Sequence, residues 1–169
     1  IKQYASQYLD QFVAWRRHIH SHPELSGEEQ ETSLYIQKIL GELGMPYVND
    51  ISDYAVIGEI QGAHTGPVIA LRADIDALPI HEATGLPFAS QNEGVMHACG
   101  HDSHIAILIG ADAILQSIKD QLHGTVKLVF QPSEKEDLFP GAQGLVASGN
   151  LNDVDEINGI HVWQQLHVG

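Results

Sequence analysis

The chain has 169 residues, 43% apolar and 18% charged, which is typical of a globular domain with a buried core. Eight Lys and Arg against 22 Asp and Glu give a net charge of −14, which argues against binding to nucleic acids or anionic membranes, since both need clustered positive charge. The longest apolar run, over 105–115, is too short to span a bilayer. The single cysteine, Cys99, cannot form an intrachain disulfide, so we expect a cytoplasmic protein.

The first third of the chain predicts two helices. Apolar residues recur at helical spacing over 4–20, and Pro23 limits how far that helix can run. Ser26 followed by Glu29 is a capping-box pattern, which predicts that a second helix opens there. Gly44 is expected to end this helix.

Further along, short β-branched segments alternate with helical patterns. Strands are predicted over 55–60, 68–73, 124–130 and 156–163, and helices over 104–118 and 142–148. The segment 78–97 contains several Pro and Gly residues and no periodicity, so it is expected to be a long loop, a feature that is usually functional. Asp102 or Ser103 is expected to cap the helix over 104–118. This alternation predicts a three-layer α/β fold.

Polar side chains follow the predicted strands. The groups concerned are Asp74 and Asp76, Glu134 and Glu136, and His161. In open α/β sheets the ligand site lies outside the carboxyl ends of the strands, so we expect these groups at one edge. Each has a simpler explanation when taken alone: a turn with two solvated acids, an acidic surface run, and a hydrogen-bonded core histidine.

The two aspartates of the 74–76 segment lie on the same side of an extended chain because side chains alternate in direction. Like charges this close repel, which predicts a nearby cation or a shifted pKa at Asp74 or Asp76. Arg72 is expected to point to the other face.

The densest chemical signal is the segment 97–104, which contains His97, Cys99, His101, Asp102 and His104. Thiolate and imidazole are good ligands for zinc and similar divalent metals. The Cys99-x-His101 spacing allows both side chains to reach one centre, and Asp102 and His104 could orient these ligands. The alternative is a helix-capping loop with an incidental buried cysteine. Because so many such residues fall together after a long loop, we favour a metal site.

Six stretches, taken in order, resemble the metal-dependent M20 peptidases: 15–26, 70–79, 84–90, 94–102, 124–132 and 159–163. The resemblance is to the amidohydrolase branch, which includes hippurate hydrolases, N-acyl-amino-acid amidohydrolases, N-acetyldiaminopimelate deacetylases and plant auxin-conjugate hydrolases. It implies a catalytic domain of the zinc-peptidase type, with three α/β/α layers and a mostly parallel central sheet.

The resemblance also implies a centre with two divalent metal ions, such as Mn, Zn, Co or Ni. Cys99 and His101 match the family's first ligand pair, and His161 matches its glycine-x-histidine ligand. Glu134 matches the general base. Asp76, with the acid two residues before it, matches a paired-acid motif that supports the catalytic site.

One position departs from the family pattern. The family typically has two consecutive glutamates, the second of which binds metal, whereas this chain has Lys135 there. An ammonium group has no lone pair to donate. Since neighbouring side chains alternate in an extended segment, Glu136 is expected to share a face with Glu134 and to take the ligand role. The alternative is a non-catalytic or single-metal relative that binds ligands.

The resemblance implies hydrolysis of the amide bond of an N-acyl amino acid, a small-molecule substrate, with Glu134 moving a proton from water to the leaving amine. A purely structural metal module is a third possibility, but such a site needs four ligands and no spare base. Family members are more than twice as long. Residues 1–169 are therefore expected to be the N-terminal segment of the catalytic domain, inactive alone. An inserted satellite domain that forms homodimers and a C-terminal catalytic part are expected beyond residue 169.

Overall fold

The computed structural model describes residues 2–134, 141–163 and 165–167. The helices are α1 (Lys2–Gln7), α2 (Leu9–Ser21), α3 (Gln30–Glu42), α4 (His101–Ser117) and α5 (Gly141–Ala147), with a short 3-10 helix, η1 (Lys119–Gln121). The strands are β1 (Tyr47–Val48), β2 (Val56–Gln61), β3 (His64–Asp74), β4 (His123–Gln131) and β5 (Glu156–Gly159). Within the described ranges, none of the helices has the length and apolar character needed to cross a membrane.

The five strands form one mixed sheet in the order β1-β2-β4-β3-β5. β3 runs parallel to both β4 and β5, whereas β2 runs antiparallel to β1 and β4. β2 and β3 follow each other closely in the chain, yet β4 lies between them, with Leu128 opposite both Gly58 and Leu71. The parallel part of the sheet is therefore the half centred on β3.

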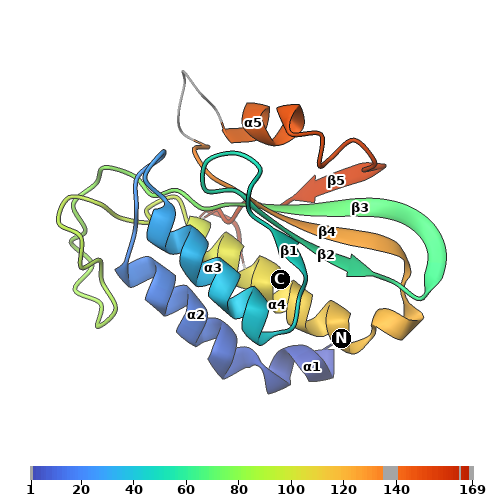
Figure 1. Cartoon of the computed structure of the whole chain (residues 1–169). Coiled ribbons are helices and arrows are strands. Elements are labelled where there is room, and N and C mark those ends of the chain that lie inside the picture. Colours follow the sequence, from blue (N-terminus) through green and yellow to red (C-terminus); the bar gives the residue numbers. More distant parts are fainter. Residues whose placement is uncertain (1, 135–140, 164, 168–169) are drawn as a thin grey trace.

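Helices cover both faces of this sheet, which confirms the predicted three layers. Figure 1 shows α2, α3 and α4 on one face and α5 on the other. Side chains along β4 alternate between the two faces of the sheet, so this strand packs against the helices on both sides. Leu128 and Phe130 lie in the larger core on the side of α2, α3 and α4, and Val129 packs with Leu145 of α5. Leu128, Val129 and Phe130 are all buried, so the second half of this central strand has no solvated face.

Several element boundaries differ from the sequence-based expectation. The first predicted helix is divided at Tyr8 into α1 and α2. The last strand ends at Gly159, so His161 lies just beyond it rather than within it. The segment 78–97 contains no helix or named strand, as predicted.

Both predicted helix caps are wrong. α3 begins at Gln30, and its first N–H groups are accepted by the Glu24 carboxylate, at 2.7 Å from the N of Thr32. Ser26 instead donates its hydroxyl proton to Asp76. α4 begins at His101 after the left-handed Gly100, with no side-chain cap, so the predicted metal motif and the helix start coincide.

Candidate metal centre

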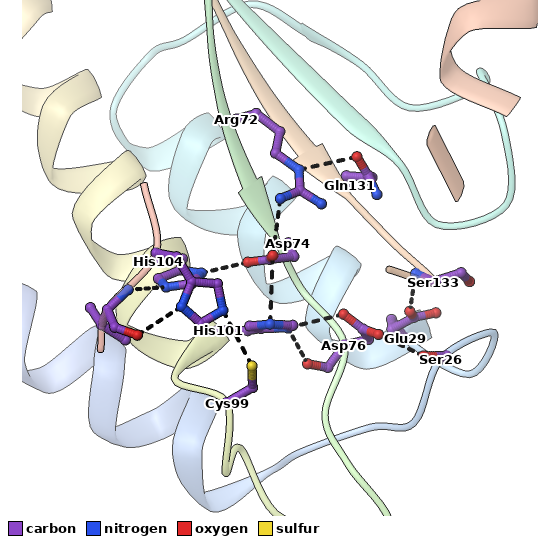
Figure 2. Close-up of polar contacts among 12 residues, drawn as sticks. Ser26, Glu29, Arg72, Asp74, Asp76, Cys99, His101, His104, Gln131 and Ser133 are labelled. Carbon is purple, nitrogen blue, oxygen red and sulfur yellow. Dashed lines mark hydrogen bonds and ion pairs between the residues drawn. The ribbon is translucent and has the colours of Figure 1, made fainter. Parts of the chain in front are cut away.

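The carboxyl ends of β3, β4 and β5 meet the start of α4, and Asp74, Asp76, Cys99 and His101 converge there (Figure 2). Cys99, His101 and His161 each offer a ligand atom within 4.8 Å of the other two. The Sγ of Cys99 lies 3.3 Å from the Nε2 of His161. Two neighbouring groups and a third that is 62 residues from Cys99 in the sequence thus form the thiolate-imidazole set predicted from the sequence, which suits zinc and related metals.

His101 is oriented as a metal-binding histidine should be. Its Nδ1 lies 2.8 Å from the carbonyl oxygen and 3.0 Å from the Oδ1 of Asp76, so Nδ1–H donates to Asp76. The Nε2 atom is buried, makes no hydrogen bond among the described residues and lies 3.5 Å from Asp74 Oδ2. A carboxylate that accepts a hydrogen bond from one ring nitrogen keeps the ring proton on that nitrogen. The other nitrogen is then unprotonated, which is the usual arrangement around a metal ligand. The residues present therefore fit a divalent metal.

His104 orients the segment that carries His161. The backbone N–H of Val162 donates to His104 Nε2 at 3.0 Å, so the other ring nitrogen carries the proton and donates to Asp74 Oδ1 at 2.5 Å. His161 in turn donates from Nδ1 to the Val162 carbonyl, and its Nε2 faces Cys99. His104 thus acts through its hydrogen bonds, as predicted.

Asp102 has a different role from the one predicted. Its carboxylate is fully buried and accepts hydrogen bonds from Arg16 Nε at 2.6 Å and His20 Nδ1 at 2.9 Å. His20 also contacts Glu82 through Nε2. The Asp102 hydrogen bond is the largest influence on the pKa of His20 and, despite burial, raises it. Asp102 therefore connects α4 to α2 and, through His20, to the long loop. It does not orient one of the proposed metal ligands, which was the role predicted for it.

A cation lies near Asp74, as the repulsion between the two aspartates predicted. This cation is Arg72, which was expected to point to the other face. Burial raises the pKa of Asp74, but the His104 hydrogen bond, His101 and Arg72 lower it to about 2. Arg72 Nη1 lies 3.0 Å from Asp74 Oδ2. The expectation that Arg72 points to the opposite face of the strand is therefore wrong. The reason is the strand period itself, since residues two apart share a face.

Glu134 approaches the same histidine from the end of β4. Carboxylate oxygens of Glu134 and Asp76 and a ring nitrogen of His101 all lie within 4.8 Å of one another. The two acids of the paired-acid motif and Glu134 are thereby brought together with His101. Lys135 and Glu136 lie outside the described residues.

A cleft of about 420 Å³ opens beside the cluster. Its lining includes Met96, His97, Cys99, His161 and Trp163. His97 is almost fully buried, and burial lowers its pKa to about 4, so the ring is neutral at neutral pH. The cleft is large enough for a small organic molecule to reach Cys99 and His161.

Some residues around the centre were missed by the sequence analysis. Ser26 contacts Asp76, Glu29 contacts the backbone that precedes Glu134, and His20 contacts Asp102. The Ser26–Glu29 pair was recognised as a pattern but interpreted as a helix cap. No local spacing signals these contacts, because the partners are 50 or more residues apart.

A sequence model of peptidase family M20/M25/M40 matches residues 70–168, a range that covers more than half of the chain and every proposed ligand and acid. The chain belongs to the M20 peptidase family. This M20 chain is 46% identical over 159 residues to the N-acetyl-L-cysteine deacetylase of Bacillus subtilis, covering 94% of the chain and 38% of that protein. It is 40% identical over 170 residues to the N-acyl-L-amino acid amidohydrolase of Geobacillus stearothermophilus, covering 100% and 45%.

Solved structures agree with the fold of this M20 chain. A crystal structure of a dinuclear metal-binding M20 peptidase from Bacillus subtilis superposes with a TM-score of 0.90 at 44% identity, covering 95% of this chain and 45% of that one. An aminohydrolase described from methicillin-resistant Staphylococcus aureus superposes with a TM-score of 0.91 at 36% identity, covering 98% and 45%. The chain thus spans less than half the length of these relatives.

Proposed function

We propose that this chain is the N-terminal segment of the catalytic domain of a metal-dependent amidohydrolase. The reaction is hydrolysis of the amide bond of an N-acyl amino acid, such as an acetyl or benzoyl derivative, to a carboxylic acid and a free amino acid. The convergence of Cys99, His101 and His161 carries this proposal, with a buried His101 Nε2 that makes no hydrogen bond among the described residues. The deacetylase and amidohydrolase names of the relatives favour the substrate class.

The proposed cofactors are two divalent metal ions. Cys99, His101 and His161 would contribute ligands, and Glu136 is proposed as a further one. The description of the Bacillus subtilis structure as dinuclear supports the stoichiometry. When bound, such ions supply Lewis acidity: they lower the pKa of a water molecule and polarise the substrate carbonyl.

The chain's own residues supply the proton chemistry. Glu134 accepts a proton from the attacking water and returns it to the leaving amine. Asp76 accepts the hydrogen bond from His101 Nδ1–H. This contact fixes the imidazole ring of His101, which lies close to the carboxylates of both Asp76 and Glu134. The cleft beside Cys99 and Trp163 would admit the small-molecule substrate. The assembled protein is proposed to be a cytoplasmic homodimer.

The test is hydrolysis of N-acetyl and N-benzoyl amino acids by the full-length protein with added Mn²⁺. Glu134→Gln preserves the shape of the side chain but removes the base, so kcat should fall by about 10²–10⁴-fold while the metal content stays unchanged. Glu28→Gln, at an exposed position, is the control and should retain the wild-type rate. A wild-type rate in Glu134→Gln would exclude Glu134 as the base.

Lys135 supports a second candidate, a relative that binds one metal and does not catalyse. The two proposals differ in metal content, measured by mass spectrometry after dialysis against trace Mn²⁺ or Zn²⁺. If Glu136 is a ligand, Glu136→Ala lowers the content and Lys135→Glu changes it little. If Lys135→Glu instead raises the bound metal from about one to about two ions per chain, the natural protein is a one-metal relative.

A further inference from the structure

Glu29 has a completely buried carboxylate that the fold itself does not require as a helix cap. It precedes α3, whose first N–H groups are accepted by Glu24. Oε1 of Glu29 instead accepts the backbone N–H of Ser133 at 2.6 Å, across 104 residues of sequence. Burial is the main cause that raises the pKa of Glu29, to about 7. The Ser133 N–H is thus a long-range partner that offsets part of the cost of burying this carboxylate.

That partner lies in a strained turn. Ser133 has φ +52, a left-handed conformation that costs about 1 kcal/mol or more for a residue with a Cβ. Its N–H is bonded by Glu29, and its carbonyl oxygen accepts the N–H of Gly141 at 3.2 Å. Strain of this kind persists only where the surroundings fix it, and here hydrogen bonds hold the peptide groups before and after the Cα of Ser133.

The turn determines where Glu134 points, because Ser133 is the residue directly before it. The segment before α3 also holds the opposite side of the site: Ser26 Oγ donates to Asp76 Oδ2 at 2.6 Å (Figure 2). One short stretch of chain therefore positions the backbone of Glu134 and the carboxylate of Asp76, the two acids that flank His101.

We propose that Glu29 is the positioning residue for the general base: its carboxylate holds the Ser133 N–H and so directs the Glu134 side chain toward the centre. This inference rests on the proposed function, since Glu134 is a base only in that reaction. A displacement of about 1 Å in a reacting group can cost about 100-fold in rate, so the effect should appear in kcat.

The test compares two substitutions of nearly equal size in the full-length protein. Glu29→Gln keeps an oxygen that accepts the Ser133 N–H, and kcat should remain within about threefold of wild type, the difference between a charged and a neutral acceptor. Glu29→Met removes the acceptor, and kcat should fall by about 100-fold with KM and metal content nearly unchanged. The exposed Glu28→Gln is the control.

A double-mutant cycle separates positioning of the base from a general structural effect. In the Glu134→Gln background no base remains to be directed, so Glu29→Met should lower the residual rate by less than about threefold. An equal loss of about 100-fold in both backgrounds would overturn the proposal, because it would show that Glu29 acts independently of Glu134.

Hydrogen exchange of the Ser133 amide tests the contact without reference to activity. The amide should be protected in the wild type and in Glu29→Gln and should exchange faster in Glu29→Met. Rapid exchange in the wild type overturns the proposal even if the Met variant fails to fold. If the wild type hydrolyses no N-acyl amino acid, the proposed function fails, whereas the exchange data still decide whether Glu29 holds this turn.

Discussion

At the scale of single residues, the centre is organised by which ring nitrogen each histidine protonates. His101 and His104 both donate from Nδ1 to a carboxylate, and His161 donates from Nδ1 to a backbone carbonyl. The Nε2 atoms of His101 and His161 are thereby directed to the cluster, and that of His104 accepts the Val162 N–H. The acids near the centre thus determine tautomers as well as charge.

Asp112 is a buried acid on α4 that takes no part in this arrangement. It is completely buried, and burial raises its pKa to about 6, an effect that the Gln116 side chain only partly offsets. Below the unfolded pKa of about 4, this acid is protonated in both the folded and the unfolded state, so burial of its charge costs nothing. Its penalty grows as the pH rises to about 6 and is then constant, at about 3 kcal/mol.

Asp112→Asn should therefore stabilise the protein at pH 8 by about 3 kcal/mol and change its stability little near pH 4. The measurement is urea unfolding of both proteins at pH 4, 6 and 8. Asp120→Asn, at an exposed position on η1, is the control and should leave the free energy of unfolding unchanged at each pH. A constant difference between Asp112→Asn and wild type from pH 4 to 8 would contradict the assignment.

At the scale of elements, the parallel pairing of β3 and β4 brings Asp74 and Glu134 to the same edge of the sheet. Asp74 ends β3 opposite Gln131, the last residue of β4, and Glu134 follows three residues later. The other end of this pair is closely packed. Gly124 has φ +85, and a Cβ there would lie 1.9 Å from the carbonyl oxygen of Pro67. Only glycine fits this approach of the two strands.

Gly124→Ala should lower the free energy of unfolding by about 3 kcal/mol, through left-handed strain and the clash with Pro67 together. Gly85→Ala is the matched control, since Gly85 has φ +68 but no atom within 4 Å of the added Cβ, and should cost about 1 kcal/mol. Chemical denaturation measures both. Equal losses in the two variants would show that the close approach does not contribute.

At the scale of the whole molecule, the candidate centre joins segments that are far apart in the chain. Cys99 precedes α4, His101 begins it, and His161 follows β5. A metal ion that binds all three stabilises the folded state relative to the unfolded chain, by about 2.7 kcal/mol at a free metal concentration 100 times the Kd. Metal removal should therefore affect the stability of the fold as well as catalysis.

A chelator should accordingly lower the thermal midpoint of the full-length protein, and Cys99→Ser should reduce this shift. His64→Asn is the control, since His64 is an exposed residue that stacks on His123 and belongs to none of the candidate metal groups among the described residues. It should show the wild-type shift. Equal midpoints with and without chelator in the wild type would argue against a metal at Cys99, His101 and His161.

Local patterns in the sequence were sufficient to identify most elements and the chemistry of the centre. Helical and alternating periods located α3, α4, α5 and the strands β2 to β5 to within a few residues, because burial of one face is recorded in the spacing of apolar residues. The two-residue strand β1 is too short to carry such a period and was not predicted. The Cys99-x-His101 motif and the acids after the strands likewise indicated candidate donors, several of which the fold brings together, since metal chemistry requires those residue types.

Tertiary structure alone decided the strand order and the partners of the buried acids. The insertion of β4 between β2 and β3 and the contact of Glu29 with Ser133 depend on residues far apart in sequence. Ser26 and Glu29 match a helix cap locally, yet in the folded chain Ser26 contacts Asp76 and Glu29 contacts the backbone of Ser133. Local spacing records which face of an element is buried, but which distant group it meets is determined only when the elements pack.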